Sequence, residues 1–264
     1  MASAAPAQQL PLLYNDLMPL SSITHANLKV RPSESAPFLS KIHAVPVTID
    51  EFVAAQRFYP IVFSTGDSPV PLALMGLNEG VNVFVDDEGR LIGEPYVPAY
   101  IRRYPFMLAR TQPGVEDLSL CFDPQSDIVG EFEDGSALFE NGQPSEATQT
   151  VLKFCEEFEL SAQRTGGFIE ELKAAELLID GEASVQPTGG EPYVYRGFQM
   201  VAEEKLRELR GDTLRKMNQN GMLPLIMAHL FSLSLVPDLF GRQMRQGKGP
   251  QIQPAAAAPE PANA

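Results

Sequence analysis

The residues best suited to bind an anion lie close together in the segment 96–106, which reads YVPAYIRRYPF. The candidate ligand- or partner-binding residues in it are Tyr96, Tyr100, Arg102, Arg103 and Tyr104. The arginines could bind a carboxylate or a phosphate, and the tyrosines could add stacking or hydrogen bonds. Because its prolines predict an irregular strand, the two arginines should point to opposite faces, with only one facing any given site. The structural alternative is that one arginine pairs with a carboxylate of the acidic region 123–146.

Histidine is the second candidate for site chemistry. His43 precedes a predicted strand and joins the candidate binding residues, whereas His229 lies inside an apolar helix. Neither these two nor His25 has the short spacing that zinc or iron ligands commonly show, so structural histidines are favoured and no metal is expected. An enzyme would need His25 or His43 within reach of the paired arginines, where it could transfer protons to or from an anionic substrate.

Other catalytic and cofactor motifs are missing from the sequence. There is no GxSxG nucleophile elbow, no GxGxxG and no P-loop, so we expect no catalytic residue and no cofactor. The acidic turn at 86–88 lacks the ligand register of an EF-hand, and a solvated hairpin tip is favoured over calcium. Cys121 and Cys155 lie in apolar contexts, which predicts reduced, buried thiols.

Charge and hydropathy limit the class of partner. The formal net charge of −14 argues against nucleic acid and against an anionic membrane surface. Residues 1–16 lack the pattern of a secretory signal, so we expect a cytoplasmic protein, and signal-independent export stays open. The apolar stretch 222–236 has fifteen residues, fewer than the roughly 20 that span a bilayer, and predicts a core helix, with a partner contact as the alternative. No membrane span is expected.

The first half of the chain is patterned as short strands and hairpins. Residues 49–57 predict a single short helix between two strands. Gly89 supplies the positive φ that a hairpin turn over 86–89 requires. The predicted strands are 44–48, 61–64, 71–76, 82–85, 90–92, 117–122 and 136–139.

The second half is mainly helical. Ser145 is the predicted N-cap of a helix that Gly166 and Gly167 interrupt. The further predicted elements are a helix over 168–178, a strand over 193–201, and helices over 202–210, 213–219 and 223–235. The fold class is therefore α+β: a β-rich N-terminal half with a helical C-terminal half packed on it. We expect one domain over 14–244, with disordered ends at 1–13 and 245–264.

Several short segments of this sequence, in this order, resemble those of the SapC-like family of bacterial proteins. They are THANLKV (24–30), HAVPVT (43–48), YPIVF (59–63), NVFVDDEGRLIG (82–93), YVPAYIRRYPF (96–106) and GMLPLIMAHLFSL (221–233). The resemblance covers about residues 14–240. It points to the soluble family named after a surface-layer-associated protein, and not to the peptide-transporter permease of the same name, because no spanning helix is expected. Similar proteins accompany outer-membrane nutrient uptake systems and flavin-dependent halogenase-like proteins, but the family implies no reaction and no catalytic residues.

Three functions remain open at this point. The first is a non-enzymatic binding or accessory protein that recognises a protein partner or a small anionic ligand through 96–106. The second is an enzyme, or a subunit of one, that uses an arginine and histidine pocket on a small anionic substrate. The third is a surface-layer component. A pocket that joins His25 or His43 to the arginines would favour the second function, and a shallow surface there would count against it.

Overall fold

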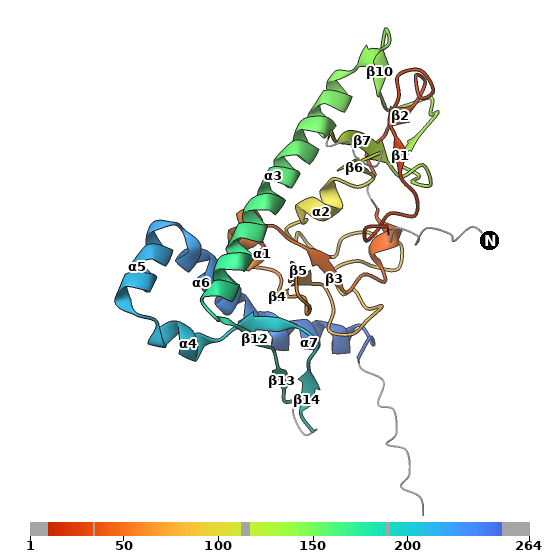
Figure 1. The fold of residues 1–264 in the computed structure, drawn as a ribbon. Coiled ribbons are helices and arrows are strands. Elements are labelled where there is room, and N and C mark those ends of the chain that lie inside the picture. The colour runs from red at the N-terminus through yellow and green to blue at the C-terminus, as the bar shows by residue number, and fades with distance from the viewer. Residues whose placement is uncertain (1–9, 34, 112–116, 188–190, 250–264) are drawn as a thin grey trace, which may run out of the picture.

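A computed structural model describes residues 10–33, 35–111, 117–187 and 191–249. The long helix α3 (Glu146–Ala174) runs from a group of small sheets at one end of the molecule to a larger sheet and the C-terminal helices at the other (Figure 1). Short strands dominate the first half of the described chain and helices the second, which confirms the α+β prediction.

The larger sheet has five antiparallel strands taken from both halves of the chain. Its order is β12 (Leu178–Asp180), β15 (Gln199–Val201), β4 (Ile61–Phe63), β5 (Pro71–Leu74) and β3 (Ala44–Pro46). The predicted strands near 44, 61 and 71 are thus confirmed. Because β15 pairs with β4, the sheet ties the two halves together.

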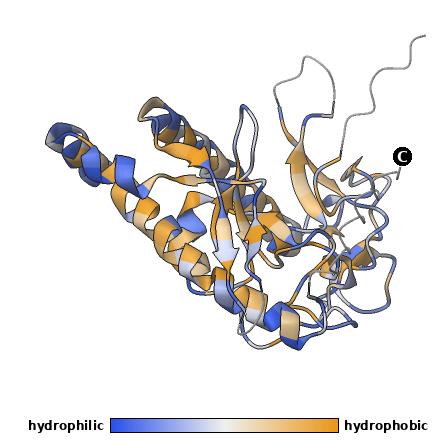
Figure 2. Ribbon diagram, turned by 90° about the horizontal axis from the view of Figure 1, so that it is seen from below, coloured by the Kyte–Doolittle hydropathy of each residue, from blue (hydrophilic) through white to orange (hydrophobic). Residues whose placement is uncertain are grey.

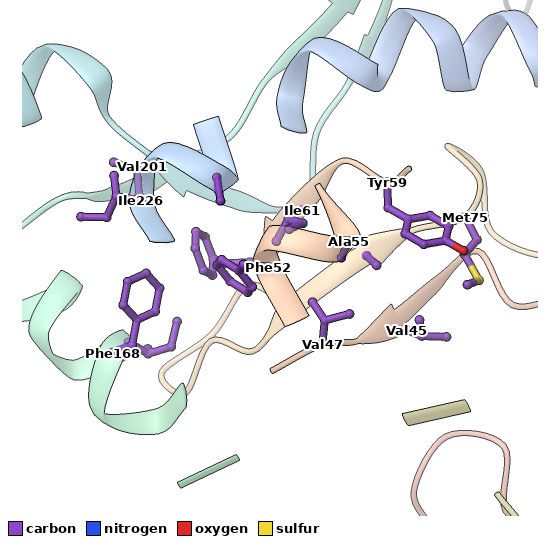
Figure 3. Packing of buried hydrophobic residues seen from close by; sticks show 14 of the residues in the cluster. Val45, Val47, Phe52, Ala55, Tyr59, Ile61, Met75, Phe168, Val201 and Ile226 are labelled. Carbon is purple, nitrogen blue, oxygen red and sulfur yellow. The ribbon is translucent and has the colours of Figure 1, made fainter. Parts of the chain in front are cut away.

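One face of this sheet is covered by the main core. The short helices between β3 and β4, η2 (Ile49–Glu51) and α1 (Phe52–Ala55), confirm the helix predicted there. Phe52 of α1 is fully buried and meets Phe168 of α3 edge-on at a centroid distance of 5.9 Å. Figure 3 shows Val201 and Ile226 on the same side of Phe52, so strands and helices from distant parts of the chain share one core. In Figure 2 the hydrophobic colour is concentrated on these central strands and helices.

A second, smaller core lies against the first half of α3. It is built from Phe106, Leu108, Phe122, Val129, Leu138 and Cys155. The strands around it are β1 (Met18–Pro19), β7 (Ser119–Phe122) and β6 (Phe106–Ala109) in one sheet, β8 (Val129–Gly130), β2 (Lys29–Val30) and β9 (Ser136–Ala137) in another, and the pair β10 (Phe139–Glu140) and β11 (Gln143–Pro144). Helix α3 therefore connects two cores.

The prediction that glycines break this helix is wrong. Helix α3 passes through Gly166 and Gly167 without interruption, although the N-cap at Ser145 is confirmed by its hydroxyl, which accepts a hydrogen bond from the Thr148 amide. A helical glycine costs only about 1 kcal/mol relative to alanine. The tertiary packing of Cys155 before the pair and Phe168 after it offsets that cost.

The C-terminal helical run is longer than the sequence indicates. After α4 (Glu203–Glu208) and α5 (Gly211–Gln219) come α6 (Met222–Ser232), η3 (Leu233–Leu235) and α7 (Val236–Arg245). Helix α7 was not predicted. The run of 24 residues, Met222–Arg245, is long and apolar enough to cross a membrane by length and composition alone, and it continues beyond the apolar stretch 222–236 from which no membrane span was expected.

Buried polar side chains bind this run to the rest of the protein. The Ser232 hydroxyl accepts a hydrogen bond from the amide of Ile61, and Gln243 Oε1 accepts one from the amide of Leu77. Both side chains are completely buried. The inner face of the run is therefore part of the core, as predicted for 223–235.

One predicted hairpin and one predicted strand are less regular than expected. Around Gly89, whose φ is +79°, the turn forms, but only the isolated bridge between Val85 and Leu91 joins its arms. The predicted strand 193–201 bends at Gly197, with φ +93°, into β14 (Tyr193–Tyr195) and β15. Strand β14 pairs with β13 (Ala183–Val185) in a hairpin that projects from the molecule (Figure 1). The 3₁₀ helix η1 (Pro37–Leu39) lies between β2 and β3 in the chain.

Most of the termini predicted to be disordered lie outside the described residues. Within the described part, the carbonyl of Leu12 accepts a hydrogen bond from the Tyr100 hydroxyl. At the other end, Lys248 donates to the carbonyl of Asn82.

Candidate functional site

The segment 96–106 is a helical turn followed by a strand, so the prediction of an irregular strand through the arginines is wrong. Helix α2 (Ala99–Arg102) begins after Pro98, and β6 starts at Phe106. The helical turn is stabilised from outside, because the Glu51 carboxylate accepts the otherwise unpaired amide of Ala99 at 2.6 Å. Glu51 and Ala99 are 48 residues apart in the sequence, and no local sequence pattern indicates a contact between residues so far apart.

Glu51 is the hub of the segment, where it accepts hydrogen bonds from several elements, and it was not among the site residues predicted from the sequence. Its side chain is buried, and its two oxygens accept four hydrogen bonds. Oε1 accepts from the Ala99 amide and from the Tyr96 hydroxyl, at 3.0 Å for the latter, while Oε2 accepts from the amide and the hydroxyl of Thr48. The pattern Thr48-x-x-Glu51 is a capping box and could have marked the helix start, but not the contact with Tyr96. Burial, followed by the charge of Glu51, raises the pKa of Tyr96.

Arg103 is an internal residue. Its side chain is 5% exposed, and its guanidinium carbon lies 4.1 Å from the ring centroid of Phe158 and 4.5 Å from that of Tyr100. Nη1 lies 3.4 Å from Oε1 of Glu159. The expected partner in 123–146 is therefore wrong: α3 crosses the segment and brings its own carboxylate. Buried between two rings, Arg103 is not open to a ligand from solvent.

The remaining tyrosines are also used internally. The Tyr100 hydroxyl donates to the carbonyl of Leu12 at 2.8 Å, and the Tyr104 ring packs against Phe38 and Tyr14, with centroids 4.5 and 5.4 Å away. Burial is the main cause that raises the pKa values of Tyr100 and Tyr104. Both rings contribute to packing at the base of α2.

Arg102 differs from its neighbour because it is exposed. Nε donates to the carbonyl of Val97 at 3.1 Å, and Nη2 donates to the Tyr96 hydroxyl at 3.3 Å. The guanidinium carbon lies 5.1 Å from the ring centroid of Phe154. Within the described part of the chain Arg102 makes no ion pair, so the guanidinium is held in place with further N–H donors facing outward.

The structure does not bring the histidines to this segment. His43 lines a separate cavity of about 260 Å³ at the five-stranded sheet, to which no residue of 96–106 contributes. His25 accepts a hydrogen bond from the Ser21 amide at Nδ1 and packs edge-on against Phe122. Among the described residues, no three His, Cys, Asp or Glu side chains are placed to hold a metal ion.

His229 has the structural role that the sequence predicts. Its ring is completely buried, Nδ1 lies 2.8 Å from the carbonyl of Ile61, and Nε2 accepts the Val201 amide at 3.1 Å. This arrangement requires a neutral imidazole with the proton on Nδ1. Burial lowers its pKa to about 4.

The two cysteines are free and buried, as predicted. Burial raises the pKa of Cys155 to about 11, which keeps it a thiol at neutral pH.

Sequence comparison adds one finding to this geometry. A family model described as SapC matches residues 20–239, which is most of the chain. No curated protein and no solved structure matches the sequence.

Proposed function

The chain belongs to the SapC family, and we propose that it works there as a non-enzymatic binding or accessory protein that recognises an anionic group on a partner or small ligand through Arg102. The proposal rests on the exposure, the fixed position and, within the described part of the chain, the missing ion pair of the Arg102 side chain. It is exposed, it is fixed by Val97 and Tyr96, and it is unpaired among the described residues.

A fixed guanidinium suits recognition because little rotamer entropy remains to be lost on binding. Arg102 also has an aromatic neighbour in Phe154, against which a bound group could pack. The protein as a whole is acidic, so a local positive charge without a carboxylate partner is a place where an anion meets less repulsion than elsewhere on the acidic surface. Raising the salt concentration is expected to weaken this binding.

The enzyme alternative has weaker support. General acid–base chemistry at the arginines would need a proton-transferring group close to them. Among the described residues, His43 lines a different cavity and His25 packs against Phe122. Of the carboxylates beside the segment, Glu51 is buried with both oxygens occupied, and Glu159 is paired with the buried Arg103.

The wider role in the cell remains part of the proposal. A link to bacterial nutrient uptake or to the cell surface, or a place in a surface layer, rests on the family resemblance. A cytoplasmic location is proposed from the sequence. Cell fractionation distinguishes these: protein found only in the cytosolic fraction would count heavily against a surface-layer component.

The test is co-purification with matched arginine variants. Wild-type chain, Arg102→Ala and Arg110→Ala are expressed as bait in the native cell, and bound proteins and small molecules are quantified by mass spectrometry. Arg110 is a suitable control because it is also an exposed arginine outside the 96–106 segment. We expect Arg102→Ala to lose the specific partner or ligand at least about ten-fold, the scale of one charge-assisted contact.

Circular dichroism and unfolding curves of the three baits provide the folding control. Retention of the same partner or ligand by folded Arg102→Ala would contradict the proposal. Equal loss in Arg110→Ala would also contradict it, because the effect would then follow net charge and not the fixed guanidinium.

A further inference from the structure

The cavity lined by His43 lies on the outer face of the five-stranded sheet. Ala44 of β3 is paired with Leu74 of β5, and both are only half-buried. They alternate along their strands with Val45 and Ala73, which are fully buried in the main core, so they lie on the other face of the sheet. The β13–β14 hairpin and α7 border this floor and leave about 260 Å³ between them.

The walls of the cavity are mostly apolar. Leu72 continues the floor, Phe198 lies on one side, and Val236 at the start of α7 lies on another. An apolar cavity of about 150 Å³ is enough to bind benzene. The present volume therefore accommodates an aromatic ring with a small substituent.

Two polar side chains at the cavity have no partner in the described structure. The hydroxyl of Tyr195 is buried and makes no hydrogen bond, and the imidazole of His43 makes none either. Burial raises the pKa of Tyr195, so its hydroxyl keeps its proton and remains a donor. An unpaired buried hydroxyl is unfavourable, and an oxygen atom brought by a ligand would remove that penalty.

The charges at the mouth favour an uncharged ligand. Arg196 lines the cavity, but its guanidinium is already paired with Glu182, with Nε and Nη2 at 2.8 and 2.5 Å from Oε2. Glu79 also lines the cavity. It is exposed and makes no ion pair with the described residues. A carboxylate ligand would therefore meet an unpaired negative charge and no free arginine.

We propose that this cavity is a binding site for a small uncharged molecule that is apolar over most of its surface and carries one oxygen acceptor, which Tyr195 and His43 recognise. The site is separate from Arg102, so either proposal can fail without the other.

Three probes of similar size test the proposal. The ¹⁵N-labelled full chain is titrated with acetophenone, with ethylbenzene, which lacks the oxygen, and with benzoate, which carries a charge. We expect acetophenone to shift the amide signals of residues 43–44, 72–77 and 195–198. Ethylbenzene should bind about five-fold more weakly, the value of one hydrogen bond, and benzoate more weakly still.

Variants locate the binding in the cavity. Ala44→Leu and Leu74→Phe put larger side chains on the cavity floor, one from β3 and one from β5, and so fill part of the cavity. Each should weaken acetophenone binding at least about ten-fold. Val194→Ala is the matched control, because Val194 lies between Tyr193 and Tyr195 on β14 and is exposed on the other face of the hairpin. Tyr195→Phe should reduce acetophenone binding to the level of ethylbenzene without lowering the midpoint of thermal unfolding, since its hydroxyl has no partner in the free protein.

Four results would overturn the inference: no binding of acetophenone, amide shifts outside the cavity, equal affinity for ethylbenzene, or tighter binding of benzoate. If Tyr195→Phe lowered the unfolding midpoint and left the affinity unchanged, the hydroxyl would have a structural role instead. Arg102→Ala should leave acetophenone binding unaffected.

Discussion

The segment 96–106 and the cavity beside the β13–β14 hairpin differ in how their polar atoms are used. In the segment, the hydroxyls of Tyr96 and Tyr100 and Nη1 of Arg103 have partners inside the protein, and the one buried side-chain atom without a hydrogen bond among the described residues of the segment is Arg103 Nε, which lies beside the rings of Phe158 and Tyr100. In the cavity, Tyr195 and His43 have none among the described residues. A dense group of aromatic and basic residues can therefore be used almost entirely by the fold itself, whereas the cavity keeps a hydroxyl and an imidazole without protein partners in the described part of the chain.

The largest effect should come from removing the hub of the segment. Glu51→Ala leaves the Ala99 amide, the Tyr96 hydroxyl and two donors of Thr48 without their acceptor. We expect a loss of about 3–5 kcal/mol in the free energy of unfolding, measured by urea denaturation.

Glu88→Ala is the control for that measurement. Glu88 is an exposed carboxylate in a surface ion pair with Arg90, and its removal should change the free energy of unfolding by less than about 1 kcal/mol. Similar values for both variants would show that the Glu51 network does not stabilise the segment, and would remove the contrast with the cavity.

A second prediction concerns pH and His229, a buried polar group with partners on both ring nitrogens. Burial lowers its folded-state pKa to about 4 from an ordinary value of 6.5. The stability that depends on the neutral ring is fully present above pH 6.5. It is lost as the pH falls towards 4, by up to about 3 kcal/mol, because the unfolded chain takes up the proton first.

His229→Gln separates this effect from the titration of carboxylates. Glutamine can still donate to Ile61 and accept from Val201, but it does not titrate. Between pH 6.5 and 4, urea denaturation should show the wild-type protein losing more stability than the variant. Parallel pH profiles would mean that the imidazole has access to protons in the folded protein.

The sequence predicted those parts of the fold that depend on local pattern. The strands at 44, 61 and 71, the Ser145 cap and the buried face of α6 follow from alternation, capping chemistry and helical spacing. Helix α7 was not predicted, although Pro237 in its first turn is compatible with a helix start, because a proline there loses no hydrogen bond.

The site was less predictable because it depends on contacts between distant residues. Glu51 reaches Ala99 over 48 positions, and Arg103 reaches Glu159 over 56. Neither separation leaves a periodic signal. The sequence did indicate that the two arginines point different ways, but the reason is a helical turn and not a strand.

The most direct test of the central claim, that Arg103 belongs to the framework while Arg102 is free for a ligand, is to compare the unfolding free energies of Arg103→Ala and Arg102→Ala. Arg103→Ala removes the contacts with Phe158, Tyr100 and Glu159 and should cost about 2–3 kcal/mol. Arg102→Ala should cost less than about 1 kcal/mol, because its hydrogen bonds lie at the surface. Equal costs, or a larger cost for Arg102→Ala, would contradict the account.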